Sequence, residues 1–555
     1  MKDFSILIGG KAGDGIDKAS AIIGQILSHI GYYIYIHRDY PSLIRGGHTF
    51  SIIRASEKKI SAHKEEIDIL LALNLETINL HHKLLKEKCF YIYDSSQVKI
   101  EGQVCGTGID ISLILKQENA PEFTRNVCLI GAFCKAAGID WPTTEKILKR
   151  TIPKQIEINL KVAKKGYESA SSLLSIEKIR NNPLPVLTGN EAIGLGLIAG
   201  GLDAYAGYPM TPSSGLLHFL AGVAPQFNLQ VIHAENEISV ILMALGFAYT
   251  GKKAAVGTSG GGFCLMNEGL SLAGMAELPI VIVLGQRTGP STGLPTYTGQ
   301  TELFYAIHSG HGEFTRFVVA PGDSEQAYYW SAISMGIAWK YQIPSIILSD
   351  KTLAESLFSF NIEKVENLNL PEIITWSQKS EYKRYSYTEN GVSPLLFVPQ
   401  KNVVIKVNSY EHDEFGITTE DPEITKKMQE KRTKKEKHLL QEIEEKYQCV
   451  NSYGNQESDV ALLCWGSNMP VCVELSERLN LKTVQPVVLH PFPSTQFSKA
   501  ISGVKKLVVV ECNATGQLAK LVQNYGFPVH HKILKYDGRP LSVNELEEKI
   551  QRILT

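Results

Sequence analysis

The sequence lacks a large net charge, positive or negative, and it has no closely spaced cysteines. Its 555 residues carry 56 Lys and Arg against 57 Asp and Glu, so no overall positive field draws a polyanion, and nucleic acid is not an expected partner. None of the nine cysteines forms a C-x-x-C pair. Because iron–sulfur clusters need closely spaced thiolates, we expect no such cluster on this chain.

Long apolar runs are also lacking. The start of the chain has no basic segment followed by an apolar one, and the most apolar stretch, near Gly274–Gly285, is interrupted by Glu277 and Pro279. This composition predicts neither a signal peptide nor a membrane span. We therefore expect a cytoplasmic protein with no membrane partner, and a chain of this length predicts several domains.

The sequence does contain short apolar strands that alternate with helical segments. Residues 1–182 open with the strand Phe4–Ile8, a glycine turn and the helix Ala19–Gly31, and Asp68–Leu73 predicts another buried strand. This order is typical of a doubly wound α/β domain. Two prolines in NNPLP (181–185) predict a linker after it.

Two further α/β domains are predicted after the linker. Residues 186–365 contain the strand-like runs Ala254–Gly257, Pro279–Leu284 and Ser345–Leu348, and residues 456–555 contain strands at Val460–Cys464 and Leu507–Val510 and a final helix, Val543–Leu554. Residues 366–455 form a linker ending in the charged run Glu423–Tyr447, which predicts a solvated connecting helix that packs on a neighbouring domain or subunit. We therefore predict an α/β protein of three doubly wound domains.

Three glycine motifs are similar to phosphate-binding or metal-binding loops. Gly246–Lys252 (GFAYTGK) ends a helical segment and has Lys253 where a P-loop needs Ser or Thr, so no P-loop is predicted. Gly13–Gly15 (GDG) lacks the asparagine-rich turn that a magnesium motif needs downstream, so we expect no metal site on this chain. The loop Gly9–Gly15 is either a plain turn or a turn whose N–H groups face an anion or another subunit.

Several longer segments resemble the fused gamma–alpha subunit of 2-oxoacid:ferredoxin oxidoreductases, most of all the 2-oxoglutarate type. GKAGDGI with Tyr40–Gly47 (YPSLIRGG) resembles the gamma domain. Thr188–Ser214, His233–Phe263 and Gly285–Thr296 resemble the domain that binds the pyrimidine half of thiamine diphosphate. EHDEFGITTEDPE, CWGSNM, HPFP and VVVECNATGQLA resemble the family's later segments, so the likeness covers nearly the whole chain and implies a last domain of the transketolase C-terminal type.

The chain departs from the family's motifs at three places. Met210 replaces an isoleucine in YPITPSS, Ser259–Phe263 reads SGGGF in place of SGPGF, and GKAGDGI replaces GEAGQGI. The first is a volume-conserving apolar exchange. The other two keep their turn glycines but alter the loops around them.

Glu237 is the candidate catalytic residue. Thiamine diphosphate is activated when a carboxyl group hydrogen-bonds N1′ of its aminopyrimidine. Asn236 predicts a helix cap that places Glu237 in the first turn, ahead of the apolar residues Ile238, Ile241, Leu242 and Leu245. The resemblance assigns the activating role to Glu237; a first-turn charge that complements the helix dipole is the plain alternative, and Glu235 is the second candidate.

A 2-oxoacid needs a planar donor for its carboxylate. Arg287 follows an apolar strand and precedes a glycine–proline loop, which is where α/β sheets place ligand loops. The resemblance adds Thr211 and Thr296 as substrate-binding residues. It also implies cofactor contacts from these positions: Tyr208, Pro209, Gly260 and Gly261.

The resemblance implies oxidative decarboxylation of a 2-oxoacid, best taken as 2-oxoglutarate, to an acyl-coenzyme A. Thiamine diphosphate would be shared with a beta subunit that carries Mg²⁺ and a [4Fe–4S] cluster, coenzyme A would be the co-substrate, and ferredoxin would take the electrons. An (alpha–beta)2 heterotetramer is expected. Pyruvate or a branched-chain 2-oxoacid is the alternative substrate; a non-catalytic assembly subunit and a simple decarboxylase are alternative functions.

Overall fold

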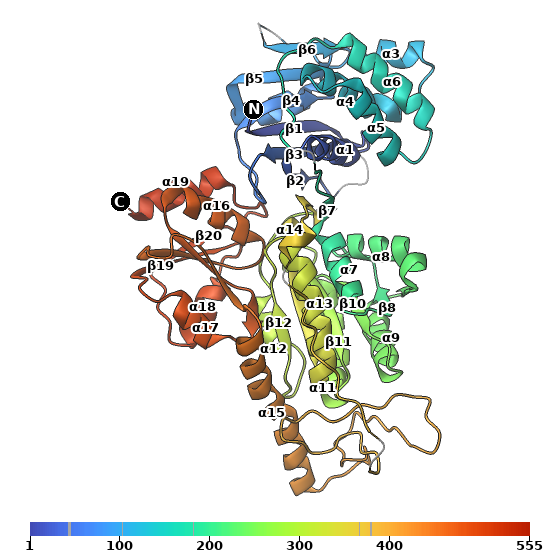
Figure 1. The fold of residues 1–555 in the computed structure, drawn as a ribbon, viewed down its shortest axis with the longest axis vertical. Helices are drawn as coiled ribbons and strands as arrows, with labels where there is room; N and C mark the ends of the chain where they lie inside the picture. Colours follow the sequence, from blue (N-terminus) through green and yellow to red (C-terminus); the bar gives the residue numbers. More distant parts are fainter. Residues whose placement is uncertain are drawn as a thin grey trace. The chain divides into compact units, whose positions relative to one another are not determined.

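The computed structural model describes residues 1–42, 46–100, 102, 104–180, 182–365, 367–377 and 380–554. These form two compact units (Figure 1). The first comprises Met1–Thr188, Glu355–Asn361 and Ser542–Thr555, and the second comprises Gly189–Ala354 and Ile362–Leu541. Part of the YPSLIRGG motif (residues 43–45), the first residue of the expected linker (181) and the domain boundary at 366 lie outside the described residues.

The first unit is built on one mixed sheet of eight strands. Their order is β6 (Gly106–Ile109), β5 (Leu85–Asp94), β4 (Ile67–Ala72), β1 (Asp3–Lys11), β3 (His48–Ser56), β2 (Tyr33–Asp39), β14 (Leu357–Ser359) and β7 (Val186–Thr188). Strand β1 is parallel to β4 but antiparallel to β3. The sheet is therefore mixed, because β2 and β3 form a hairpin beside the parallel strands.

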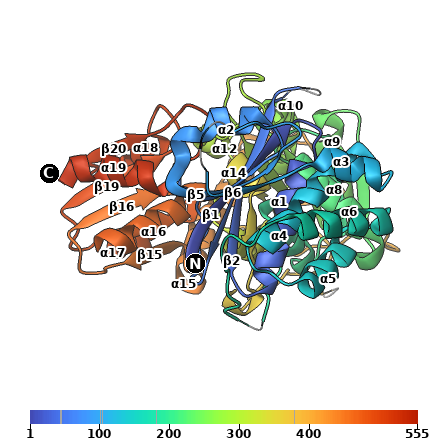
Figure 2. The same ribbon diagram turned by 90° about the horizontal axis from the view of Figure 1, so that it is seen from above.

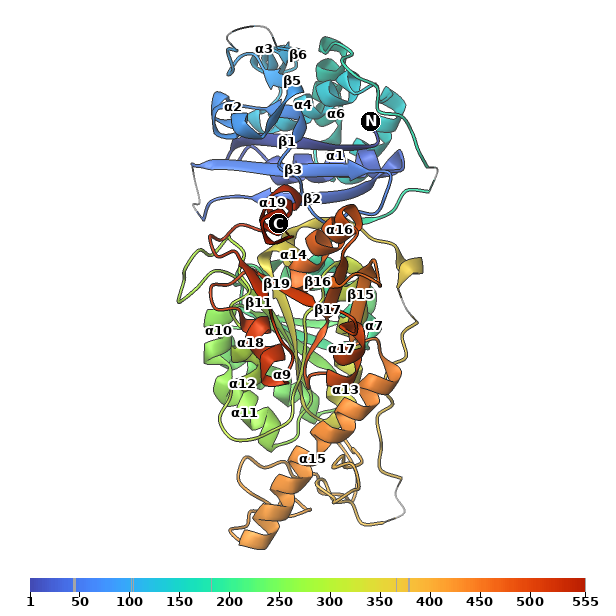
Figure 3. The ribbon, with the colours of Figure 1, turned by 90° about the vertical axis from the view of Figure 1, so that its left-hand side faces the viewer.

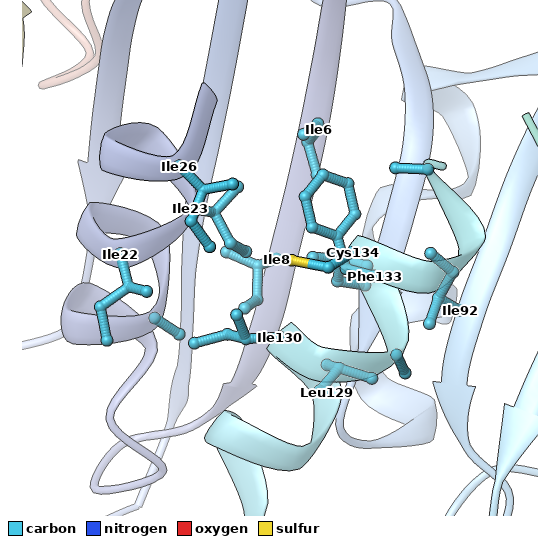
Figure 4. Close-up of a cluster of buried hydrophobic side chains, with 14 of the residues drawn as sticks. Ile6, Ile8, Ile22, Ile23, Ile26, Ile92, Leu129, Ile130, Phe133 and Cys134 are labelled. Atoms are coloured by element: carbon cyan, nitrogen blue, oxygen red, sulfur yellow. The ribbon is translucent and has the colours of Figure 1, made fainter. Parts of the chain in front are cut away.

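The main core of this unit lies on one face of the sheet. Along β1, Ile6 and Ile8 face the helices α1 (Ile16–His29) and α4 (Arg125–Ala136), whereas Leu7 belongs to a separate apolar cluster. Figure 4 shows Ile6 and Ile8 in one cluster with Ile23 of α1 and Phe133 of α4. This alternation is the period of two that a strand buried on both faces requires.

The remaining helices complete the first unit. Figure 2 shows α5 (Trp141–Thr151) and α6 (Ile156–Ser169) beside α1 and α4. Helices α2 (Leu75–His81) and α3 (Ile111–Gln117) are shorter. The C-terminal helix α19 (Val543–Leu554) also belongs to this unit, whereas the sequence-based boundaries assign it to the last domain.

The second unit contains a seven-stranded sheet that carries the predicted site. Its order is β18 (Val488–His490), β12 (Phe317–Val319), β13 (Pro344–Asp350), β11 (Ile280–Gln286), β10 (Ala254–Thr258), β8 (Ala204–Gly207) and β9 (Gln230–His233). All neighbours are parallel except β12 and β18. The connecting helices are α7 (Gly189–Ala199), α8 (Ser214–Phe227), α9 (Glu237–Tyr249), α10 (Gly260–Leu265), α11 (Asn267–Met275), α12 (Leu303–His308), α13 (Ser324–Tyr341) and α14 (Lys351–Glu355).

A third sheet lies in the same unit. Its order is β15 (Val450–Gly454), β17 (Lys482–Pro486), β16 (Val460–Cys464), β19 (Lys506–Glu511) and β20 (His531–Leu534), with α16 (Met469–Leu479), α17 (Ser494–Ala500) and α18 (Gln517–Asn524). The α/β class and the expected sheets are thus confirmed. The boundaries of the individual domains remain a prediction.

The charged run forms helix α15 (Pro422–Lys446), capped by the carboxylate of Asp421 (Figure 3). Most of its positions are solvent-accessible, but one face is buried. Lys431 and Lys435 are buried, and both pair with the buried Glu277 at 2.7 Å and 2.5 Å. Charge alone cannot reveal this burial, because the partner carboxylate lies about 150 residues earlier in the chain.

Among the described residues, no helix is both long enough and apolar enough to cross a membrane.

Candidate functional site

The predicted site residues follow four neighbouring parallel strands. Glu237 comes after β9, Tyr208–Thr211 after β8, Gly260 after β10 and Arg287 after β11. Because the carboxyl ends of parallel strands meet at one edge of a sheet, the fold gathers these segments there. The sequence motifs, which are spread over about 80 residues, thus become one site.

Glu237 is the first residue of α9 and is only 2% exposed. Asn236 caps the helix by accepting a hydrogen bond from Ser239 N at 3.0 Å, as its position in the sequence predicts. Glu235, the second candidate, is exposed. Burial therefore favours Glu237 as the residue that would meet an enclosed ligand.

One oxygen of Glu237 has unused hydrogen-bonding capacity. In the described part of the chain, Glu237 Oε1 and the neighbouring Thr258 Oγ1 are buried and have no hydrogen-bond partner. A methyl group at Gly262 would overlap both oxygens. Since buried polar atoms are nearly always satisfied, a free carboxyl oxygen beside a glycine fits a ligand that hydrogen-bonds there.

The three glycines of SGGGF face different surroundings at the start of α10. A methyl group at Gly260 would lie 2.8 Å from Glu302 Oε1, Gly262 meets Glu237 and Thr258, and Gly261 has open space around it. Ser259 Oγ contacts Met210 Sδ at 2.6 Å. Met210, which replaces the isoleucine of the family motif, therefore packs against this turn. The turn is thus closed on two sides and open at Gly261.

Arg287 and Thr211 are brought together across the β8 and β11 loops. Arg287 Nη1 donates a hydrogen bond to the carbonyl oxygen of Thr211 at 2.9 Å. Burial lowers the pKa of Arg287, and the charge of Glu302 opposes that change. Thr296 lies further along the loop after β11, and its buried Oγ1 finds no partner in the described structure.

Tyr208 and Pro209 are exposed where β8 ends. The Tyr208 ring lies 6.3 Å from the His233 ring, between centroids. Both residues are therefore accessible to a ligand or another chain at this edge.

Sequence reasoning missed Thr258, Gly262 and Glu302. The backbone N of Glu302 donates to Gln286 Oε1 at 3.1 Å, and burial raises the pKa of its carboxyl to about 7. A carboxylate that follows Gln300 and Thr301 in the chain carries no signal of this burial. Glu302 lies beside Gly260 only in the folded structure, because the two residues are about 40 positions apart in the sequence.

The apolar face of α9 is buried on one side only. Ile241 and Leu245 are buried, but Ile238 and Leu242 are 49% and 40% exposed, so the predicted apolar face extends beyond the core. Leu265 of α10 is also 49% exposed. Exposed apolar side chains next to a buried glutamate are typical of a surface that another chain covers.

Together, the parallel sheet and the buried glutamate at its carboxyl edge define an α/β ligand-binding domain. Residues 195–431 match the family model described as "Pyruvate flavodoxin/ferredoxin oxidoreductase, thiamine diP-bdg". Residues 5–169 match the model "Pyruvate ferredoxin/flavodoxin oxidoreductase".

Full-length relatives narrow this class. The 2-oxoacid:ferredoxin oxidoreductase subunit alpha of Saccharolobus solfataricus is 32% identical, with 99% of this chain and 98% of the relative covered. The 2-oxoglutarate synthase subunit KorA of Methanocaldococcus jannaschii is 28% identical over 66% of this chain and 98% of the relative. This chain belongs to the alpha subunits of the 2-oxoacid:ferredoxin oxidoreductases, and it is an oxidoreductase subunit of a multi-subunit enzyme.

A solved structure matches the whole fold. The 2-oxoglutarate:ferredoxin oxidoreductase from Magnetococcus marinus, with 2-oxoglutarate, coenzyme A and succinyl-CoA bound, aligns with a TM-score of 0.90 at 28% identity. The match covers 100% of both chains. The α/β architecture is therefore shared with that enzyme from end to end.

Proposed function

We propose that this chain activates thiamine diphosphate through Glu237 and binds the carboxylate of a 2-oxoacid, best taken as 2-oxoglutarate, for oxidative decarboxylation to an acyl-coenzyme A. The observation that carries the proposal is the buried Glu237 carboxyl, whose Oε1 has no partner among the described residues. Its position at the carboxyl edge of a parallel sheet is where ligands of α/β folds bind.

The residues at this edge fit the pyrimidine half of the cofactor. Glu237 would hold a proton at Oε1 for the pyrimidine nitrogen, and the open side at Gly261 leaves room for a flat ring next to the Gly260–Gly262 turn. Tyr208 and Pro209 would bound the ring from the β8 loop. When bound, thiamine diphosphate supplies the nucleophilic carbon and the electron sink. Burial of Glu237 keeps water away from this carboxyl.

The substrate carboxylate would bind at Arg287. A guanidinium offers two parallel donors to a carboxylate, and the hydrogen bond from Arg287 Nη1 to the Thr211 carbonyl fixes its orientation. The unpartnered hydroxyl of Thr296 would supply a further donor. These contacts hold the carbon–carbon bond that is to be cleaved in one orientation.

The exposed apolar residues around Glu237 support a partner subunit. We propose that a beta subunit covers Ile238, Leu242 and Leu265, and that it holds the diphosphate, Mg²⁺ and a [4Fe–4S] cluster. Coenzyme A would be the co-substrate, ferredoxin the electron acceptor and (alpha–beta)2 the assembly. The bound 2-oxoglutarate, coenzyme A and succinyl-CoA of the Magnetococcus enzyme support this choice of ligands.

The substrate choice is tested on the assembled complex. We expect kcat/KM to be highest for 2-oxoglutarate in a panel that includes pyruvate and a branched-chain 2-oxoacid. A preference for pyruvate or the branched-chain acid would leave the role of Glu237 intact but overturn the substrate assignment.

The role of Glu237 is tested by Glu237→Gln in the same complex. Because Gln keeps the shape but loses the acid, we expect turnover to fall by about 10²–10⁴-fold, the range of a lost acid–base group, with assembly intact by size-exclusion chromatography. Glu235→Gln is the matched control and should turn over normally. Full activity in Glu237→Gln, with loss in Glu235→Gln, would move the role to Glu235.

A further inference from the structure

The third sheet has a topological switch point, the kind of place at which open α/β sheets bind ligands. Strands β16 and β19 are parallel neighbours, and β17 and β20 pair with their opposite outer sides. The connections through α16 and α18 therefore leave in opposite directions. The two loops that follow β16 and β19 meet at the carboxyl edge, where Cys512 Sγ lies 3.2 Å from Asn468 Oδ1. A ligand would be expected between these loops.

Gln300, from the loop after β11, occupies this switch point. Its side chain is fully buried, and its Nε2 donates a hydrogen bond to Trp465 O at 2.8 Å. Its Oε1 accepts hydrogen bonds from Asn468 Nδ2 at 2.6 Å and from Cys512 N at 3.0 Å. Its backbone N also donates to Cys512 O at 2.8 Å. One glutamine is thus bonded to both loops, in the place where a ligand would lie.

Gln300 ends the loop that carries the proposed substrate ligands Arg287 and Thr296. Thr288, the residue after Arg287, donates a hydrogen bond from its Oγ1 to the carbonyl oxygen of Thr298 at 2.8 Å. Thr298 lies midway between Thr296 and Gln300 in the chain. The segment anchored by Gln300 is therefore bonded to the immediate neighbour of Arg287, so the anchor acts on both ends of the loop.

The elements around the third sheet hold the same loop at two more places. Thr298 N donates to the carbonyl oxygen of Gly538, which follows β20, at 3.0 Å. Gln517, the first residue of α18, donates from its Nε2 to Thr301 O at 2.8 Å. The end of the loop is therefore tied to segments that follow β16, β19 and β20.

These hydrogen bonds lie within the chain and need no ligand to form. A loop that is ordered before binding loses less conformational entropy when the ligand arrives. We propose that Gln300 is a positioning residue: through the switch point of the third sheet, it holds residues 287–300 in the conformation that binds the substrate carboxylate. Gln300 itself contacts only the chain. This inference rests on the proposed roles of Arg287 and Thr296.

The test is Gln300→Leu in the assembled enzyme, which removes every side-chain hydrogen bond of the anchor. The loop then adopts the binding conformation for only part of the time, so KM for the 2-oxoacid should rise about tenfold or more. Because bound substrate orders the loop again, kcat should stay within about twofold of the wild type. Gln456→Leu, at an exposed position after β15, is the control and should keep both constants. An unchanged KM in Gln300→Leu overturns the proposal.

Hydrogen exchange of the same complex gives a readout that needs no turnover. Peptides covering residues 288–300 should exchange faster in Gln300→Leu and regain protection when the 2-oxoacid is added. Peptides from β16 and β19 should keep their wild-type protection. Unchanged exchange at 288–300 overturns the proposal, and so does loss of protection throughout β16 and β19, which would mark a merely structural residue.

Two more variants keep the outcome decisive. Thr288→Val loses only the hydroxyl that bonds Thr298 O, so it decides the question if Gln300→Leu does not assemble; KM should rise by roughly 3- to 10-fold, the value of one hydrogen bond, and an unchanged KM refutes the coupling. Arg287→Lys separates this proposal from the one on which it rests. An unchanged KM in Arg287→Lys refutes the carboxylate site, whereas a raised KM there beside an unchanged KM in Gln300→Leu refutes the role of Gln300 alone.

Discussion

At the scale of single residues, the site depends on a glycine that leaves no room for a side chain. A methyl group at Gly262 would overlap Glu237 Oε1 and Thr258 Oγ1, which are both buried and without a hydrogen-bond partner in the described structure. A side chain at this position would push the carboxyl out of the place where a ligand would meet it. The absence of a Cβ is therefore required by the close approach of these two side chains, not by the backbone conformation of α10.

We predict that Gly262→Ala impairs the enzyme without unfolding it. The methyl group must displace the Glu237 carboxyl or the Thr258 hydroxyl, and a small misplacement of a catalytic group costs on the order of 10²-fold in rate. Turnover of the assembled complex measures the effect, and circular dichroism checks the fold.

Gly222→Ala is the matched control for this prediction. Gly222 lies in the exposed part of α8 with open space around its Cα, and alanine favours the helix by roughly 0.5–1 kcal/mol. Its turnover should match the wild type. Equal turnover in Gly222→Ala and Gly262→Ala would contradict the tight contact at Gly262.

Sequence patterns predicted the residues that belong to contiguous motifs. Glu237 was identified because a helix cap precedes it and a long motif surrounds it, and Arg287 because it follows an apolar strand. Glu302 and Thr258 could not be found in this way. Glu302 and Thr258 stand out only because each has a buried side-chain oxygen without a hydrogen-bond partner in the described structure. That burial arises from the packing of strands that are distant in the chain.

At the scale of elements, α15 is held by a buried cluster of charges. Glu277 receives Lys431 Nζ at 2.7 Å on both carboxylate oxygens and Lys435 Nζ at 2.5 Å, and Arg384 donates to its backbone carbonyl at 2.7 Å. Burial opposes ionisation of Glu277, but these three cations hold its pKa well below the usual range. Burial also lowers the pKa of Lys431, to about 7.

We predict that Glu277→Gln strongly destabilises the protein. It leaves two lysines buried without a counter-charge, and removing one partner of a buried ion pair costs about 3–5 kcal/mol. Urea unfolding monitored by circular dichroism should show this loss in the free energy of unfolding.

The exposed pair on the same helix provides the control. Glu430 lies 3.9 Å from Lys426, with both side chains more than 60% exposed. Glu430→Gln should change stability by less than about 1 kcal/mol. Similar losses in Glu277→Gln and Glu430→Gln would show that the buried cluster does not anchor α15.

Strand and helix positions were largely predictable, because the period of apolar residues changes between them. The face that α15 buries was not predictable, since its buried positions include lysines in place of apolar side chains. The mixed order of the first sheet was also missed. The apolar pattern of a strand carries no signal for the direction in which the strand pairs.

At the scale of the whole molecule, the exposed apolar residues next to Glu237 indicate an incomplete surface. Ile238 and Leu242 lie one turn apart on α9, and Leu265 follows on α10; each is at least 40% exposed. Single exposed apolar residues are common, but a group on two helices that pack together favours coverage by another chain.

We predict that Leu242→Glu weakens association with the partner subunit by at least about tenfold. A charge buried in an apolar contact costs several kcal/mol unless it is paired. The measurement is co-purification and sedimentation of the two subunits. Val404→Glu, at a loop residue that is 85% exposed, is the control and should assemble normally; intact assembly of Leu242→Glu would contradict the proposed interface.

The eight-stranded sheet has a consequence for how the chain can be divided. Strand β2 is the last strand of that sheet contributed by the first 182 residues, and its outer side is paired by β14, from residues 357–359. A protein cut at the linker would therefore present bare backbone N–H and C=O groups along β2, a template for aggregation. The N-terminal segment thus depends on a later segment of the same polypeptide to pair with its edge strand. If the gene were split at the linker, another strand would have to pair with β2 in place of β14.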